Sequence, residues 1–204
     1  MKHEPNSRLP LYAFVAFAFM MYVAPAQAHL NSTGMGPLYD GLTHFLLSPE
    51  DFVPVLALAL LAGLRGANYG RRALFTLPVA WFLGGLAGLS AVTAAPHPFI
   101  AAAWFVLLGG LLAADAKLSI RLTTALAALL GLYHGYLNGT GMGQFGTAAV
   151  ALLGLVFAVF VLVAFAAAFV VQLRLQWARI AVRVAGSWIA ASGLLMLGWA
   201  VRTR

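Results

Sequence analysis

The sequence contains no cysteine and has few charged residues. The absence of cysteine excludes disulfide bonds, thiolate zinc sites, iron–sulfur clusters and cysteine nucleophiles. Charged residues make up 8% of the chain and hydrophobic residues 63%, whereas about a quarter of the residues in a soluble domain are charged. So few charges could not cover the surface of a soluble domain of this size, and the composition therefore excludes a soluble enzyme and a disordered tail.

Acidic residues are scarcer than basic ones, with 5 Asp and Glu against 12 Lys and Arg and a net charge of +7. Such a balance would indicate a nucleic-acid partner only if the basic residues formed a patch. They fall instead into short segments between apolar runs. We therefore expect no nucleic acid as a partner, and we expect the lipid bilayer as the surroundings of the chain.

Residues 1–28 have the pattern of a secretory signal peptide. A basic start carries Lys2 and Arg8, an apolar run covers 11–24, and Ala26-Gln27-Ala28 forms a cleavage site. The run is shorter than the ~20 residues that a membrane span needs. We expect cleavage after Ala28, which would make His29 the mature N-terminus; an uncleaved first helix is the alternative.

The remaining chain, 29–204, is predicted to be a single transmembrane domain, an all-α polytopic membrane helix bundle. Hydropathy and helix-breaking residues predict six spans, and glycines within them indicate close helix–helix contacts. The spans cover about 52–64, 72–92, 98–114, 118–138, 145–172 and 184–201.

Basic residues orient this bundle. In the mature chain they occur after the first, third and fifth spans, whereas the segments 93–97 and 139–144 contain none, and only Arg202 and Arg204 at the C-terminus fall outside this pattern. By the positive-inside rule the basic segments face the cytoplasm and the mature N-terminus faces the periplasm, as for a multi-pass protein of the bacterial inner membrane. The residues concerned are Arg65, Arg71, Arg72, Lys117, Arg121, Arg174, Arg179 and Arg183.

Most imidazoles and carboxylates lie on the other, outer side, and ionisable groups in a membrane protein tend to mark function. Segment 36–47 is too short to span and is expected to form an interfacial or re-entrant helix. On it, Asp40 and His44 have i,i+4 spacing and emerge on one face. They could share a divalent ion, or the carboxylate could orient the imidazole; the alternative is a plain Asp–His hydrogen bond.

Two further patterns suggest metal ligands. His134 and Asn138 also have i,i+4 spacing, on a helix flanked by glycines, and either line an ion pathway or join two helices structurally. His29, as a free terminus, would offer both its amine and its imidazole to a metal that favours nitrogen ligands.

Three other features are weaker. His97, in the turn Pro96-His97-Pro98, is expected to be solvated. Asp115 is expected to end the third span in a local ion pair with Lys117, or to serve as an exit-side ligand. Ser48-Pro49-Glu50-Asp51 has the pattern of a helix start, with Ser48 as the cap and the acids in the first turn.

The sequence resembles the second branch of the HupE/UreJ family across essentially the whole mature chain. The likeness is densest in 29–66 and includes His134-Gly135-x-x-Asn138-Gly139. In the better-known branch an Asp-His pair is adjacent, whereas here three residues separate Asp40 from His44. The motifs that carry the resemblance are His29-Leu30-x-x-Thr33-Gly34-x-Gly36-Pro37-x-Tyr39-Asp40-Gly41-x-x-His44 and Pro49-Glu50-Asp51-x-x-Pro54-Val55-x-Ala57-Leu58-Ala59-Leu60-Leu61-Ala62-Gly63-Leu64-Arg65-Gly66.

The resemblance implies a permease for nickel or cobalt, with Ni²⁺ or Co²⁺ as substrate and no resident cofactor. Its metal residues would be His29, Asp40, His44 and His134, with Asn138, His97 and Asp115 along the pathway or behind the ligands. A second copy of the chain or a metalloenzyme maturation system would be its protein partner. Imidazole and carboxylate ligands do not discriminate between Ni²⁺, Co²⁺ and Zn²⁺. The sequence contains no Walker A motif, so the energy for transport would come from the membrane potential, a coupled ion or a partner ATPase.

Three other functions compete with this one. A non-transporting accessory or assembly protein would use its histidines structurally. An intramembrane serine protease needs an activated serine, and none of Ser90, Ser119, Ser187 and Ser192 lies in a suitable glycine context; we expect no enzyme. A b-type haem protein needs axial histidines from two helices, and only His134 is firmly within a span.

Overall fold

The computed structural model describes residues 33–91, 97–143 and 146–202. These residues form seven helices and no strand, as the sequence predicts for an all-α bundle. The signal peptide and His29 lie outside the described residues. The helices are α2 (Pro37–Leu47), α3 (Pro49–Arg65), α4 (Ala67–Leu89), α5 (Pro98–Ala113), α6 (Ile120–Met142), α7 (Ala148–Val171) and α8 (Gln176–Arg202).

Three of these helices, α4, α7 and α8, are each long and apolar enough to cross a membrane. A fourth span is formed if α2 and α3, which are bent by 74° at Ser48, are taken together. Helix α5 is apolar but has only 16 residues, and α6 falls outside this apolar set. The described residues therefore support three or four spans, and the larger number of six stays a prediction.

The helices end at different residues from the predicted spans. Helix α4 begins at Ala67, before the predicted 72–92, and α6 continues to Met142, through most of the segment predicted as the loop 139–144. Hydropathy marks only the apolar part of a helix, whereas the backbone hydrogen bonds continue through neighbouring polar and glycine residues. The short helix predicted in 36–47 is confirmed as α2.

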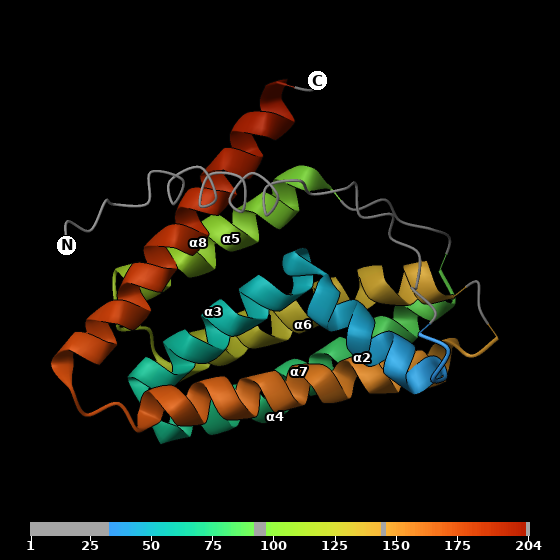
Figure 1. Ribbon diagram of the computed structural model, residues 1–204, viewed down its shortest axis with the longest axis horizontal. Coiled ribbons are helices and arrows are strands. Elements are labelled where there is room, and N and C mark those ends of the chain that lie inside the picture. Colours follow the sequence, from blue (N-terminus) through green and yellow to red (C-terminus); the bar gives the residue numbers. More distant parts are fainter. Residues whose placement is uncertain (1–32, 92–96, 144–145, 203–204) are drawn as a thin grey trace, which may run out of the picture.

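The helices are arranged so that the basic residues gather at one end. Figure 1 shows the connections α3–α4, α5–α6 and α7–α8 together at the same end of the molecule, and the α6–α7 connection at the opposite end. Helices α5 and α8 pack as a pair on one side, α4 packs against α6 and α7 on the other, and α3 lies between them. We call the first end the basic end, after the arginines and lysine listed above.

Glycine brings α4 and α6 into backbone contact. A Cβ added at Gly135 would lie 2.1 Å from the carbonyl oxygen of Trp81, and one at Gly139 would lie 2.2 Å from that of Gly85. From the other helix, a Cβ at Gly84 would lie 2.3 Å from the carbonyl oxygen of Leu132. The predicted role of the glycines in helix–helix contacts is confirmed here, and the close approach fixes the position of His134 relative to α4.

Helix α2 packs across α7 in the same manner. A Cβ at Gly41 would lie 1.8 Å from the carbonyl oxygen of Ala151, and one at Gly154 would lie 1.9 Å from that of Leu38. The chain then bends at Ser48, which is buried, and Pro49 begins α3. Leu46, Leu47, Pro49 and Glu50 around the bend are exposed, so only Ser48 at the break faces the bundle. The break positions the residues of the candidate site on either side of it.

Candidate functional site

Four polar side chains meet at the break between α2 and α3. His44 is in the last turn of α2 and Asp51 is in the first turn of α3. His134 and Asn138 come from one face of α6, with the i,i+4 spacing expected of neighbours on a helix. Asp51, His134 and Asn138 are buried and His44 is partly buried. We call His44, Asp51, His134 and Asn138 the polar network.

Hydrogen bonds join all four members. Nδ1 of His134 lies 2.7 Å from Oδ1 of Asp51, and Nδ2 of Asn138 donates to Oδ2 of Asp51 at 2.9 Å. The same amide nitrogen donates its second hydrogen to the carbonyl oxygen of His134, also at 2.9 Å. Nε2 of His44 lies 3.0 Å from Oδ1 of Asn138. Both carboxylate oxygens and both amide hydrogens are therefore used.

This pattern assigns the tautomers when Asp51 is the carboxylate. Because a carboxylate only accepts hydrogen bonds, Nδ1 of His134 donates to Asp51 and Nε2 of the neutral ring keeps its lone pair. Since Asn138 spends its amide hydrogens on Asp51 and His134, its Oδ1 accepts from Nε2–H of His44, which leaves the lone pair of His44 on Nδ1. Two imidazole nitrogens, one on each histidine, are thus available as ligands.

Nε2 of His134 is buried and has no hydrogen-bond partner among the described residues. Buried polar atoms are nearly always paired, so an unpaired one calls for a functional explanation. Aromatic rings surround this imidazole, with ring-centre distances of 5.2 Å to Tyr133, 5.5 Å to Trp81 and 6.3 Å to Trp104. Nε1 of Trp81 is likewise buried without a described partner.

The network brings together some of the residues predicted from the sequence and leaves others apart. His44, His134 and Asn138 meet, but Asp40 does not join them. Oδ1 of Asp40 instead accepts from the backbone N–H of Thr33 at 2.6 Å and from its hydroxyl at 2.7 Å. Between these two described residues of α2, Asp40 and His44, no hydrogen bond forms, so the plain Asp–His pair considered above is absent.

The other predicted residues lie elsewhere. His97 is exposed at the N-terminus of α5 and does not cap that helix with its side chain. Asp115 forms its ion pair with Arg65, at the end of α3, rather than with the predicted Lys117. The local expectation was wrong because the end of α3 reaches the end of α5 in space, and the fold offers Asp115 a partner that no short-range pattern reveals.

Asp51 is the member of the network that the sequence reasoning missed. The structure confirms that Asp51 lies in the first turn of α3. This position explains only part of the role of Asp51, because its carboxylate also forms hydrogen bonds to two residues of α6. Ser48 does not cap the helix with its side chain. The spacing between His44 and Asp51, across a turn signal at Ser48-Pro49, could have indicated that both lie at one helix break.

The described part of the chain contains no group of three or more His, Asp or Glu side chains placed to bind a metal ion together. The network instead offers two imidazoles, one carboxylate that orients one of them, and an amide that links the two halves.

Comparison with known proteins identifies one family. The model of a family described as HupE / UreJ protein matches residues 17–196. No match is found among curated proteins or among solved structures. The matched range includes every described helix except the last turns of α8, and it contains the whole polar network.

Proposed function

The chain belongs to the HupE/UreJ family, and on this premise we propose that it is an integral membrane permease for a divalent transition metal ion, with nickel or cobalt as the substrate implied by the family. The observation that carries the proposal is the polar network beside a helix break, three of whose four side chains are buried, with Nε2 of His134 lacking a partner among the described residues. The ion would enter at the outer side, bind to the network and leave at the basic end.

The position of the network supports transport. Membrane transporters place substrate sites at breaks in helices, where the ends of two half-helices contribute charge and polar groups. Here the break between α2 and α3 supplies His44 from one helix end and Asp51 from the other.

The chemistry of the network suits a transition metal. A carboxylate that accepts from one imidazole nitrogen orients the ring and raises the basicity of the other nitrogen, an arrangement common behind metal-binding histidines. Asp51 has this relation to His134. Neutral imidazoles bind Ni²⁺ and Co²⁺ well. Further ligands would come from water or from the N-terminal segment, where His29 is the sequence-based candidate.

The membrane potential can supply the energy. A divalent cation that crosses toward the negative side gains about 4.6 kcal/mol per 100 mV, twice the value for a single charge. No Walker A motif is present in the sequence, and a coupled ion or a partner ATPase are the other candidate sources of energy. No enzymatic step is part of the proposal, and the polar network acts only as a site of passage.

The proposal is tested by measuring Ni²⁺ and Co²⁺ accumulation in cells and in proteoliposomes with purified protein. We expect His134→Ala and His44→Ala to lower uptake at least tenfold, while His97→Ala, which changes an exposed imidazole outside the network, leaves it unchanged. Asp40→Ala separately tests the ligand assignment made from the sequence. Membrane abundance and helical circular dichroism show that each variant is folded.

Two results would overturn the proposal. If folded His134→Ala and His44→Ala proteins accumulate metal at the wild-type rate, the polar network is not the pathway. If wild-type proteoliposomes take up no metal while cells without the protein lose metalloenzyme maturation, the chain is a non-transporting accessory protein instead.

A further inference from the structure

We infer that the basic end contains a binding site for one anionic phospholipid, with an acyl chain in a groove between α4 and α7 and the phosphate beside Arg71 and Arg72. This site is separate from the polar network and does not depend on metal transport. Its evidence is an apolar cavity and a polar cavity that share one arginine.

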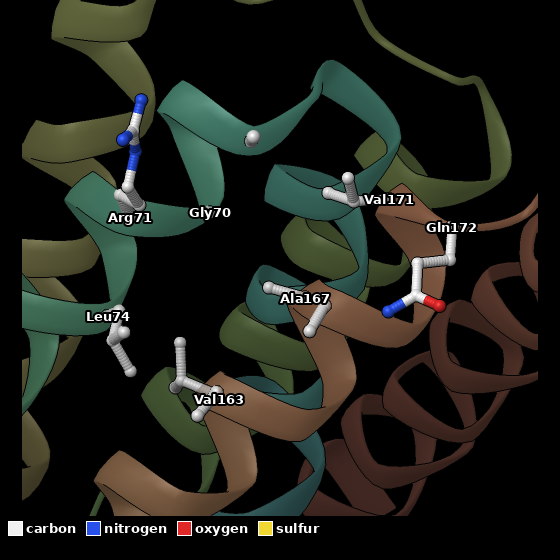
Figure 2. A pocket seen from close by; sticks show the side chains of 10 residues that line it. Gly70, Arg71, Leu74, Val163, Ala167, Val171 and Gln172 are labelled. Atoms are coloured by element: carbon white, nitrogen blue, oxygen red, sulfur yellow. The ribbon is translucent and has the colours of Figure 1, made fainter.

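The apolar part, which we call the α4–α7 groove, has a volume of about 230 Å³. It is lined by Gly70 and Leu74 of α4 and by Val163, Ala167 and Val171 of α7, with Arg71 and Gln172 at its polar margin. Figure 2 shows Leu74 and Val163 on opposite sides of the gap, Arg71 beside it on α4 and Gln172 on α7.

Small residues make this groove. A Cβ added at Gly70 would lie 3.2 Å from Cβ of Ala167, so the two helices are in near contact at that level and leave space beside it. The walls are alkyl groups, which match a hydrocarbon chain and offer little to a polar ligand. Both helices are long and apolar enough to cross a membrane, so we expect this groove to be open to lipid tails.

The polar part lies on the other side of Arg71. A second cavity of about 470 Å³ is lined by Asn68, Arg71, Arg72 and Thr76, together with Phe75 and Ile120. None of the residues that line either cavity is acidic. A guanidinium binds phosphate through paired N–H groups, and an amide and a hydroxyl beside it add further donors.

These two arginines differ from others at the basic end. Arg65 pairs with Asp115, Arg179 donates to the carbonyl oxygen of Leu64, and Arg183 donates to that of Ala113. Those guanidinium groups complete the ends of α3 and α5. Among the described residues, the guanidinium of Arg71 donates a hydrogen bond only to the exposed side chain of Asn68, and the guanidinium of Arg72 has no hydrogen-bond or ion-pair partner.

The start of α4 adds to the attraction for an anion. Gly66, the residue before the helix, provides no side-chain cap, and the first turn contains no acidic residue. Its free N–H groups therefore keep the partial positive charge of a helix N-terminus close to Arg71 and Arg72. A molecule with a phosphate and an acyl chain matches both cavities at once, as basic pockets between membrane helices do for anionic headgroups.

The test is native mass spectrometry of the full chain in detergent, with phosphatidylglycerol and phosphatidylcholine of identical acyl chains. We expect the protein to retain phosphatidylglycerol preferentially. Removal of each charge, in Arg71→Gln and Arg72→Gln, should weaken that binding about fivefold. Arg174→Gln removes an exposed arginine at the same end and should change nothing.

A second pair of variants tests the groove. Ala168→Trp places a large side chain at the exposed margin of the α4–α7 groove and should lower retention of the lipid. Val150→Trp adds the same side chain at an exposed position elsewhere on α7 and should not. Equal binding of the two lipids to the wild type, or full preference in the arginine variants, would overturn the proposal. Release of phosphatidylglycerol by inorganic phosphate, or normal retention by Ala168→Trp, would overturn the part that assigns an acyl chain to the groove.

Discussion

Asp51 offers a decisive test of the polar network, because substitutions at this residue should lower both the stability of the fold and the affinity for metal. Asp51→Ala removes the acceptor of two buried donors, Nδ1–H of His134 and one N–H of Asn138. Each buried donor left unpaired costs about 1–3 kcal/mol, so the free energy of unfolding should fall by about 2–6 kcal/mol.

Asp51→Asn should preserve both contacts of the carboxylate. The new amide oxygen can accept from Asn138, and the new amide nitrogen can donate to Nδ1 of His134 if that ring changes tautomer. The second amide hydrogen has no acceptor among the described residues, and Nε2 of His134 stays unpaired. One unpaired donor costs about 1–3 kcal/mol and each of the two weakened hydrogen bonds about 1 kcal/mol, so the free energy of unfolding should fall by about 3–5 kcal/mol. The exchange moves the proton of His134 onto Nε2, which removes the lone pair that would bind metal.

The assay measures unfolding in mixed micelles with increasing SDS, followed by circular dichroism, and Co²⁺ binding by visible absorption and calorimetry. We expect both Asp51 variants to unfold at lower SDS than the wild type, and Asp51→Asn to lose Co²⁺ affinity. Glu50→Gln, an exposed neighbour in the same turn, should change neither quantity. The reasoning is refuted if Asp51→Ala unfolds like the wild type, or if Asp51→Asn binds Co²⁺ with unchanged affinity.

Three further predictions concern the packing and the ends of the helices. Gly135→Ala should destabilise the protein by about 1–3 kcal/mol in SDS unfolding, because the new Cβ would overlap the backbone of Trp81. Gly110→Ala, whose new Cβ would have no atom within 4 Å, should be neutral or stabilising. Equal effects of the two substitutions would contradict the contact between α4 and α6. Asn138→Ala should cost about 2–6 kcal/mol in the same assay, since Oδ2 of Asp51 loses its donor and Nε2–H of His44 loses its acceptor, at about 1–3 kcal/mol each. Asp40→Ala, which removes only contacts to exposed Thr33, should cost less, and the reverse order would count against the network. A double-mutant cycle of Arg65→Ala and Asp115→Ala should show a coupling energy of about 1–3 kcal/mol, whereas a cycle of Asp115→Ala and Lys117→Ala should show none. Coupling of Asp115 to Lys117 alone would instead support the local ion pair expected from the sequence.

Much of the fold could be predicted because it depends on local composition. Apolar runs separated by glycine, proline and basic residues determine which segments become helices, and each predicted span overlaps in sequence with one helix of the structure. Pro37 and Pro49 mark the starts of α2 and α3, because a proline in the first turn loses no hydrogen bond. The ends of α4 and α6 were less predictable, since hydrogen bonding continues beyond the apolar part of each helix.

The candidate site was predictable only in part. The i,i+4 spacing of His134 and Asn138 gives their common face on α6 whatever the helix packs against. The same spacing placed Asp40 beside His44, yet Asp40 binds Thr33 and His44 binds Asn138. Spacing along a helix shows which side chains share a face, but it does not show which partner each one meets.

The sequence by itself determined that this is a helical membrane protein and which segments of it become helices. Only the tertiary structure decided that Asp51 binds His134, that Arg65 binds Asp115, and that α4 and α7 leave a groove beside Arg71. The physical reason is that hydropathy and turn signals depend on neighbours along the chain, whereas these contacts depend on the angle and relative height at which distant helices pack. Those two quantities are fixed by close backbone contacts such as Gly135 against Trp81, and a single sequence does not reveal which glycine meets which helix.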